Sequence, residues 1–102
     1  MSSNSIAQKT FSDNDKLDGT LWRIMTEDVN RDKVYSLANA LFNGFSSYTQ
    51  VGYWQGVAEQ SLVIEVITEA VDSVRLLAEQ IRDCNSQDAV LVERIANSAW
   101  LV

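Results

Sequence analysis

The sequence contains no histidine, no proline and only one cysteine, Cys84, among 102 residues. Without histidine, the chain lacks the commonest general base, the commonest metal ligand and the usual partner of a catalytic serine or cysteine. A single cysteine forms no disulfide within the chain and no thiolate metal cluster. Cys84 also lacks a histidine to activate its thiol. These absences predict a protein that is not an enzyme and that holds no metal and no other cofactor.

Positive charge is scarce: eight lysines and arginines stand against fourteen acidic residues, which gives a net charge of -6. This balance disfavours generic nucleic-acid binding, which needs a basic surface to displace counterions. It suits a protein that docks onto a partner with a basic surface. It leaves room for a small anionic ligand held by a few arginines. Clustered carboxylates such as Glu27 and Asp28 are interpreted as solvated surface.

Long apolar runs are also absent. No stretch of about 18 apolar residues is present, so no membrane span is expected. The first 19 residues are rich in Ser, Asn, Asp and Lys and have no apolar segment typical of a secretion signal. We therefore expect a cytoplasmic protein with a flexible N-terminal arm over residues 1–19 and one domain over residues 20–102.

Periodicity in the remaining sequence predicts four strands and two helices. Alternating or continuous β-branched and apolar residues predict strands over 20–27, 46–56, 61–69 and 88–95. Apolar residues three, four and seven apart predict helices over 31–45 and 68–85. Asp28 or Asn30 is expected to cap the first helix and Thr68 the second. Residues 57–60, "VAEQ", are interpreted as a short connector.

The order strand, helix, strand, strand, helix, strand predicts an α+β fold, the ferredoxin-like βαββαβ sandwich. Its four-stranded antiparallel sheet carries both helices on one face. Right-handed crossovers place the first and third strands in the centre of the sheet. The apolar tail over residues 96–102 is expected to form a fifth short strand or to dock on a neighbour.

The sheet face opposite the helices is expected to be apolar and to need a cover. The N-terminal arm or the tail is one cover. A second subunit is the other, and it predicts a homo-oligomer, either a dimer or a trimer. The candidate interface residues are Leu21, Met25, Val63, Ile67, Trp100 and Leu101.

Aromatic and basic residues provide the candidate site for a ligand or partner. Tyr48, Tyr53 and Trp54 lie in the second predicted strand, where one aromatic side chain packs in the core and another is free to stack a base. Arg23 and Arg94 would form an anion site if their strands carried them on one face. The structural alternatives are an aromatic cross-strand pair and ion pairs with Glu65 or Glu93.

The stretch "GYWQGVAEQSLVIEVI", followed by an amphipathic helix and "DAVLVERI", resembles the PII/CutA-like superfamily of ferredoxin-like proteins. The resemblance rests on the element order and on Tyr53, Trp54 and Gly56. It implies a trimer with inward-packed sheets and ligands bound between subunits. The connection over residues 52–61 is too short for the long loop of PII signalling proteins. The order is also similar to that of small uncharacterised phage and bacterial ferredoxin-like proteins.

Two functional hypotheses follow. The first is a non-enzymatic interaction protein that binds and blocks or scaffolds a partner protein, as phage inhibitors of bacterial defence do. The alternative is a PII-like oligomer that binds a nucleotide or another small anionic ligand at clefts between subunits.

Overall fold

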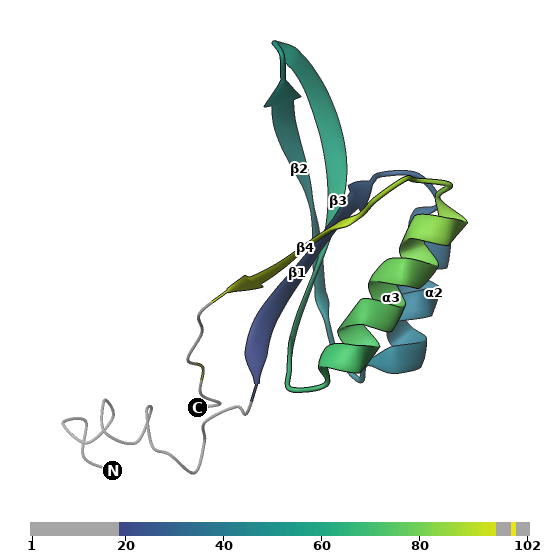
Figure 1. Cartoon of the computed structure of the whole chain (residues 1–102), viewed down its shortest axis with the longest axis vertical. Helices are drawn as coiled ribbons and strands as arrows, with labels where there is room; N and C mark the ends of the chain where they lie inside the picture. Colours follow the sequence, from purple (N-terminus) through teal and green to yellow (C-terminus); the bar gives the residue numbers. More distant parts are fainter. Residues whose placement is uncertain (1–18, 96–98, 100–102) are drawn as a thin grey trace, which may run out of the picture.

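The computed structural model describes residues 19–95 and residue 99 of the chain. Four strands and two helices follow one another in the predicted order (Figure 1). The strands are β1 (Thr20–Glu27), β2 (Ser46–Trp54), β3 (Val57–Thr68) and β4 (Leu91–Ile95). The helices are α2 (Arg31–Leu41) and α3 (Val71–Cys84). The ferredoxin-like α+β fold predicted from the sequence is therefore confirmed. The predicted arm over residues 1–19 lies almost entirely outside the described residues, as does most of the tail.

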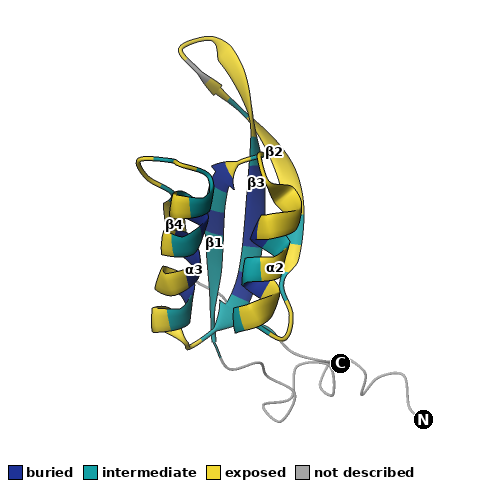
Figure 2. Ribbon diagram, turned by 90° about the vertical axis from the view of Figure 1, so that its right-hand side faces the viewer, coloured by how far each residue is buried: buried dark blue, intermediate teal, exposed yellow. Residues whose placement is uncertain are grey.

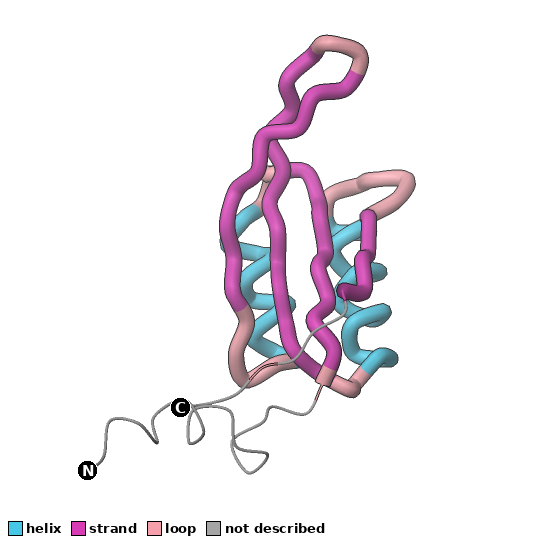
Figure 3. Tube along the Cα trace, turned by 90° about the vertical axis from the view of Figure 1, so that its left-hand side faces the viewer, coloured by secondary structure: helices cyan, strands magenta, loops and turns pink. Residues whose placement is uncertain are grey.

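The strands form one antiparallel sheet in the order β2-β3-β1-β4, with the predicted central pair β1 and β3 (Figure 3). Ile24 of β1 lies opposite Ile64 of β3 and Val92 of β4. This register places even-numbered residues of these three strands on the face that the helices cover. Odd-numbered residues lie on the other face, which we call the open face.

Helices α2 and α3 lie side by side on one face of the sheet (Figures 1 and 2). Helix α3 faces the sheet through residues three and four apart, all of them buried: Val74, Leu77, Ala78 and Ile81. They pack against the even-numbered residues of β1 and β3, among them Ile24 and Ile64, neither of which is exposed to solvent. The amphipathic period of the helix and the alternation of the strands thus meet in one core.

The hairpin that joins β2 to β3 differs from the prediction. Residues 57–60 belong to β3, and the connection is only Gln55 and Gly56. Both have positive φ, 49° and 80°, as in the two-residue turns that match strand twist. The interpretation of "VAEQ" as a connector was therefore wrong, because this turn needs no further loop residues. The pairing runs on from the sheet to Trp54 and Val57.

The helix starts also differ from the sequence prediction. Asn30 holds the cap position of α2, but its left-handed backbone, φ 54°, turns the side chain away, to the Cys84 carbonyl at the end of α3. Thr68 does not cap α3, which starts after Ala70. Its hydroxyl instead accepts a hydrogen bond from the Ala70 N–H, 3.0 Å. Strand β4 begins at Leu91, three residues later than predicted.

Candidate functional site

The β2–β3 hairpin extends beyond the part of the sheet that the helices cover (Figure 1). Strand β1 ends at Glu27, opposite Ser61 of β3, so residues 57–60 have only β2 beside them. We call residues 50–60 the hairpin arm. All are exposed except Gly52, which is partly buried, and Trp54, whose side chain lies outside what the structure describes. Figure 2 shows most of the arm in the colour of exposed residues.

A cleft lies where the arm leaves the sheet. Its volume is about 480 Å³. It is lined by the end of β1 and the loop after it, and by the first half of β3: Glu27, Asp28, Val29, Glu59, Gln60 and Ser61. We call it the hairpin-base cleft. Glu59 faces Gly52 across the hairpin, and nothing lies within 4 Å of where a Gly52 side chain would begin. The missing side chain leaves open space across the hairpin from Glu59.

Asp28 is held by two donors in this cleft. The Arg31 guanidinium donates to it through Nε at 3.1 Å, and the Gln60 amide donates through Nε2 at 2.6 Å. The hydrogen bond from Arg31, and then that from Gln60, lowers the pKa of Asp28 below its usual range. Within the described residues, Glu27 and Glu59 form no ion pair. Asp28 therefore organises the wall of the cleft, and Glu27 and Glu59 are free to meet a ligand.

The lowered pKa of Asp28 predicts a pH effect on stability. Because the folded chain favours the carboxylate, the stabilisation is complete above the unfolded pKa of about 4 and is lost as the pH falls through the folded value. Asp28→Asn should therefore shrink the fall in urea midpoint between pH 7 and pH 2, and Arg31→Gln should do the same by removing the partner. If both variants lost as much stability between pH 7 and pH 2 as the wild type does, the pairing of Asp28 with Arg31 would be contradicted.

The open face carries a charged cluster between its apolar residues. Arg23 lies between two carboxylates, 3.1 Å from Glu65 on β3 and 3.6 Å from Glu93 on β4. The Tyr48 hydroxyl donates to the same Glu65 carboxylate, 3.0 Å. Desolvation, and then the bond to Glu65, raises the pKa of Tyr48. The ion pairs that the sequence offered as the alternative role of Arg23 are thus present.

The two candidate arginines do not meet. Arg94 lies opposite Trp22, and Arg23 lies opposite Glu93, so the register puts the two guanidinium groups on opposite faces of the sheet. Tyr53 is on the hairpin arm, with 76% of its surface exposed, away from both arginines. The structure therefore does not gather Arg23, Arg94 and Tyr53 into one anion site.

The predicted interface residues of the sheet lie together on the open face. Leu21, Met25 and Ile67 are partly exposed there. Val63 is fully buried between its cross-strand partners Met25 and Tyr48, even though neither α2 nor α3 covers this face. Trp100 and Leu101 lie outside the described residues. The open face is thus a mixed surface, apolar at its ends and charged around Arg23.

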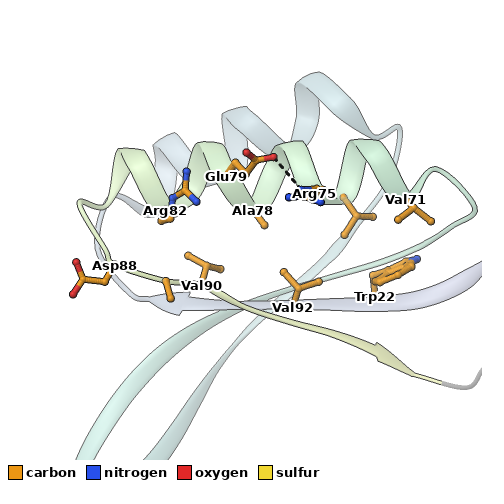
Figure 4. Close-up of a pocket in the computed structure, with 11 residues that line it drawn as sticks. Trp22, Val71, Arg75, Ala78, Glu79, Arg82, Asp88, Val90 and Val92 are labelled. Atoms are coloured by element: carbon orange, nitrogen blue, oxygen red, sulfur yellow. Dashed lines mark ion pairs between the residues drawn. The ribbon is translucent and has the colours of Figure 1, made fainter.

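A second hollow lies between α3 and the edge strand β4 (Figure 4). Its floor is apolar, with Trp22, Val74, Ala78, Val90 and Val92, and its volume is about 340 Å³. Its rim carries charged side chains, including the Arg75–Glu79 ion pair at 3.6 Å. We call it the β4 groove. Val92 on its floor keeps 38% of its surface exposed, so helix α3 leaves this edge of the sheet only half covered.

Sequence reasoning missed the hairpin-base cleft. Glu59 and Gln60 fell in the stretch interpreted as a connector, and Glu27 and Asp28 were interpreted as solvated surface. The available signal was Gln55-Gly56: a two-residue turn there would have extended β3 back to Val57 and brought Gln60 close to the end of β1. Within the described residues, no three His, Cys, Asp or Glu side chains are grouped to hold a metal ion. None of the described helices is long and apolar enough to cross a membrane.

Comparison with known proteins gives a structural likeness only. No family model matches the chain, and no curated protein matches it. Among solved structures, the chain is similar to a phage SAM lyase in its apo state, with a TM-score of 0.57 and 19% sequence identity. The match covers 81% of this chain and 88% of the lyase chain. At this identity the likeness shows that the two proteins share the ferredoxin-like fold.

Proposed function

We propose that this protein binds S-adenosylmethionine (SAM) and cleaves it as a lyase, with the hairpin-base cleft as the site. The observation that supports this most directly is the likeness to a phage SAM lyase over most of both chains. A shared fold does not establish an activity, so the site must supply the chemistry. The cleft offers carboxylates and open space at the base of the arm.

The charge of the cleft suits this ligand. SAM carries a positive sulfonium, a positive ammonium group and one negative carboxylate, and is therefore a cation overall. Glu27 and Glu59 line the cleft and form no ion pair within the described residues, so they are available to cations. The net charge of -6 adds a field of the right sign for attracting a cation. The sequence-based alternative was a small anionic ligand held by arginines. In this cleft such a ligand would be repelled by the carboxylates of Glu27 and Glu59.

The size of the cleft also suits an adenosine compound. A volume of about 480 Å³ lies within the range of small-molecule sites, about 300–1,000 Å³. Tyr53 is 76% exposed on the same hairpin but does not line the cleft. It pairs with Ala58, whereas Glu59 pairs with Gly52, so the side chains of Tyr53 and Glu59 lie on opposite faces of the hairpin.

The absence of histidine does not stand against this reaction. The sulfonium is already a charged leaving group: when a carbon–sulfur bond breaks, its electron pair neutralises the sulfur and releases a thioether. As this bond breaks, the electron pair of a C–H bond on the adjacent carbon forms a carbon–carbon double bond, and the protein needs to orient the substrate and to accept the proton that is released. A carboxylate can act as that base. We assign this role to Glu59, which has open space across the hairpin from it.

The test is to incubate the purified chain with SAM and to follow SAM loss and thioether release by mass spectrometry. Glu59→Gln should slow turnover by about 10²- to 10⁴-fold, as expected for loss of a general base. The matched control is Glu69→Gln, the same change at an exposed position in the turn between β3 and α3, outside the cleft. It should turn over like the wild type.

Binding is measured separately. SAM at 100 times its dissociation constant should stabilise the fold by about 2.7 kcal/mol, seen as a raised melting temperature. A raised melting temperature without turnover would support SAM binding and contradict the proposed lyase activity. Neither shift nor turnover would contradict the proposal and would favour the first sequence hypothesis, a non-enzymatic protein that binds a partner.

A further inference from the structure

We propose that a set of hydrogen-bonded side chains behind the hairpin-base cleft positions Glu27 to recognise the positive charge of SAM. This inference rests on the proposed function and extends it to residues that do not line the cleft. The loop after β1 and the loop after α3 lie at the same end of the two helices (Figure 1). Four polar residues join them, and we call these residues the polar network: Thr26, Asn30, Asn85 and Gln87.

The polar network is centred on the hydroxyl of Thr26. This residue is 3% exposed and is the one buried polar residue in the described part of the chain. Its hydroxyl donates to the side-chain oxygen of Gln87 and accepts a hydrogen bond from Asn85 Nδ2 at 2.9 Å. The side-chain oxygen of Asn85 accepts in turn from Asn30 Nδ2 at 3.3 Å. A buried hydroxyl without partners is costly, so the fold holds these side chains in place.

The polar network also holds the backbone of Glu27, where no neighbouring strand does so. Strand β4 begins at Leu91, opposite Met25, so its pairing with β1 stops two residues before Glu27. Beyond that point the Glu27 N–H donates to the side-chain oxygen of Gln87 at 3.4 Å. The Glu27 carbonyl accepts from Asn85 Nδ2 at 3.5 Å. Two side chains thus take the place of a strand and fix the residue that carries the carboxylate.

The carboxylate of Glu27 keeps its full charge for a ligand. All four residues of the polar network are neutral, and Glu27 forms no ion pair within residues 19–95. Glu27 lies opposite Ser61, and Glu59 is two residues away on the same side of β3. The Cα atoms of such diagonal neighbours lie about 7–8 Å apart, so a cationic group bound between them would meet both carboxylates.

The two glutamates therefore have different roles. Glu59 is the proposed base, whereas Glu27 recognises a charge that is present before the reaction begins. A side chain fixed in advance by its supporting residues recognises a ligand more precisely than a mobile one. Asn85 and Gln87 act through Glu27 and are positioning residues. Because the sulfonium charge disappears when the carbon–sulfur bond breaks, Glu27 should favour SAM over a neutral thioether.

Hydrogen exchange measured by NMR tests the positioning without any ligand. Gln87→Met has nearly the length of glutamine but no oxygen to accept the Glu27 N–H. Exchange of that amide hydrogen should therefore rise by about fivefold, as expected for the loss of one hydrogen bond. The conservative variant Gln87→Glu keeps this oxygen and loses only the 3.4 Å bond to the Ala89 carbonyl, so the exchange rate should return towards that of the wild type. Equal exchange in the two variants would overturn the positioning role.

Binding of SAM and of S-adenosylhomocysteine tests the recognition of charge. The second compound lacks the methyl group and the positive charge at sulfur. In a Glu59→Gln background, where turnover is slow, Glu27→Gln should lower the preference for SAM by about fivefold, the scale of one exposed ion pair. Glu27 is exposed, so this change leaves the core intact. Gln87→Met should lower the preference by about twofold, and Gln87→Glu should restore it.

Turnover kinetics separate the two roles when Glu59 is present. Gln87→Met should raise KM for SAM and leave kcat unchanged, the pattern of lost substrate binding, whereas Glu59→Gln lowers kcat. If the preference for SAM survived both Glu27→Gln and Gln87→Met, this inference would be overturned while the proposed function stood. A wild-type chain that binds neither compound would overturn both.

Discussion

Replacing Leu77 by alanine should lower the free energy of unfolding by about 3 kcal/mol, within the 2–5 kcal/mol typical of buried leucines. Leu77 is fully buried in helix α3, in the core between the helices and the sheet. Truncation removes apolar contacts on all sides and leaves a cavity that the rigid sheet cannot fill. For a domain whose whole stability is about 5–15 kcal/mol, such a loss is a large fraction of the total.

The neighbouring residue is the matched control. Leu76 lies on the same helix but is 43% exposed. Leu76→Ala should cost well under 1 kcal/mol, since alanine is a good helix former and the side chain loses little burial. Urea unfolding of both variants at one protein concentration measures the difference, with the concentration fixed because an oligomer would make stability depend on it. Equal losses of unfolding free energy at the two positions would contradict the assignment of Leu77 to the buried face of α3.

Gly19→Ala should cost about 2–3 kcal/mol, which corresponds to a melting temperature lower by roughly 10 °C or more in a domain of this size. Two effects add. The backbone at Gly19 has φ 141°, which strains any residue with a Cβ. The added carbon would also lie 2.7 Å from the Thr68 nitrogen and 2.9 Å from the Thr68 Cα. That backbone cannot retreat easily, because Thr68 pairs with Thr20 at the end of the β1–β3 ladder.

Gly44→Ala is the control for that variant. Nothing lies within 4 Å of its new carbon, and Gly44 does not have a positive φ. Its melting temperature should stay within a few degrees of the wild type or rise, because alanine restricts the unfolded chain. If Gly19→Ala and Gly44→Ala had the same melting temperature, the close approach of residue 19 to Thr68 would be absent in solution.

The proposed function involves the base of the hairpin arm for one physical reason. The helices cover the sheet only as far as β1 extends, and beyond Glu27 the hairpin continues with no layer beneath it. Side chains there are not committed to a core. They include the carboxylate of Glu59, which is available to a ligand.

The sequence by itself determined the element order, the central position of β1 and β3, and the buried faces of both helices. The central position of β1 and β3 follows from the right-handed crossovers. The order and the buried faces follow from local period: residues 74, 77, 78 and 81 share one side of a helix whatever surrounds it. Alternation also separates odd from even residues in each strand. It is enough to assign Leu21, Met25, Val63 and Ile67 to the face opposite the helices.

Only the tertiary structure decided how the strands align with one another. Alternation within one strand does not say which residue of the next strand lies opposite, and a shift of one residue exchanges the faces. The alignment separates Arg23 from Arg94 and encloses Arg23 between Glu65 and Glu93. It also brings Gln60 to Asp28, 32 residues away in the chain, and so builds the hairpin-base cleft. Such contacts depend on register and turn length, which arise from the packing of the whole sheet and not from any one segment.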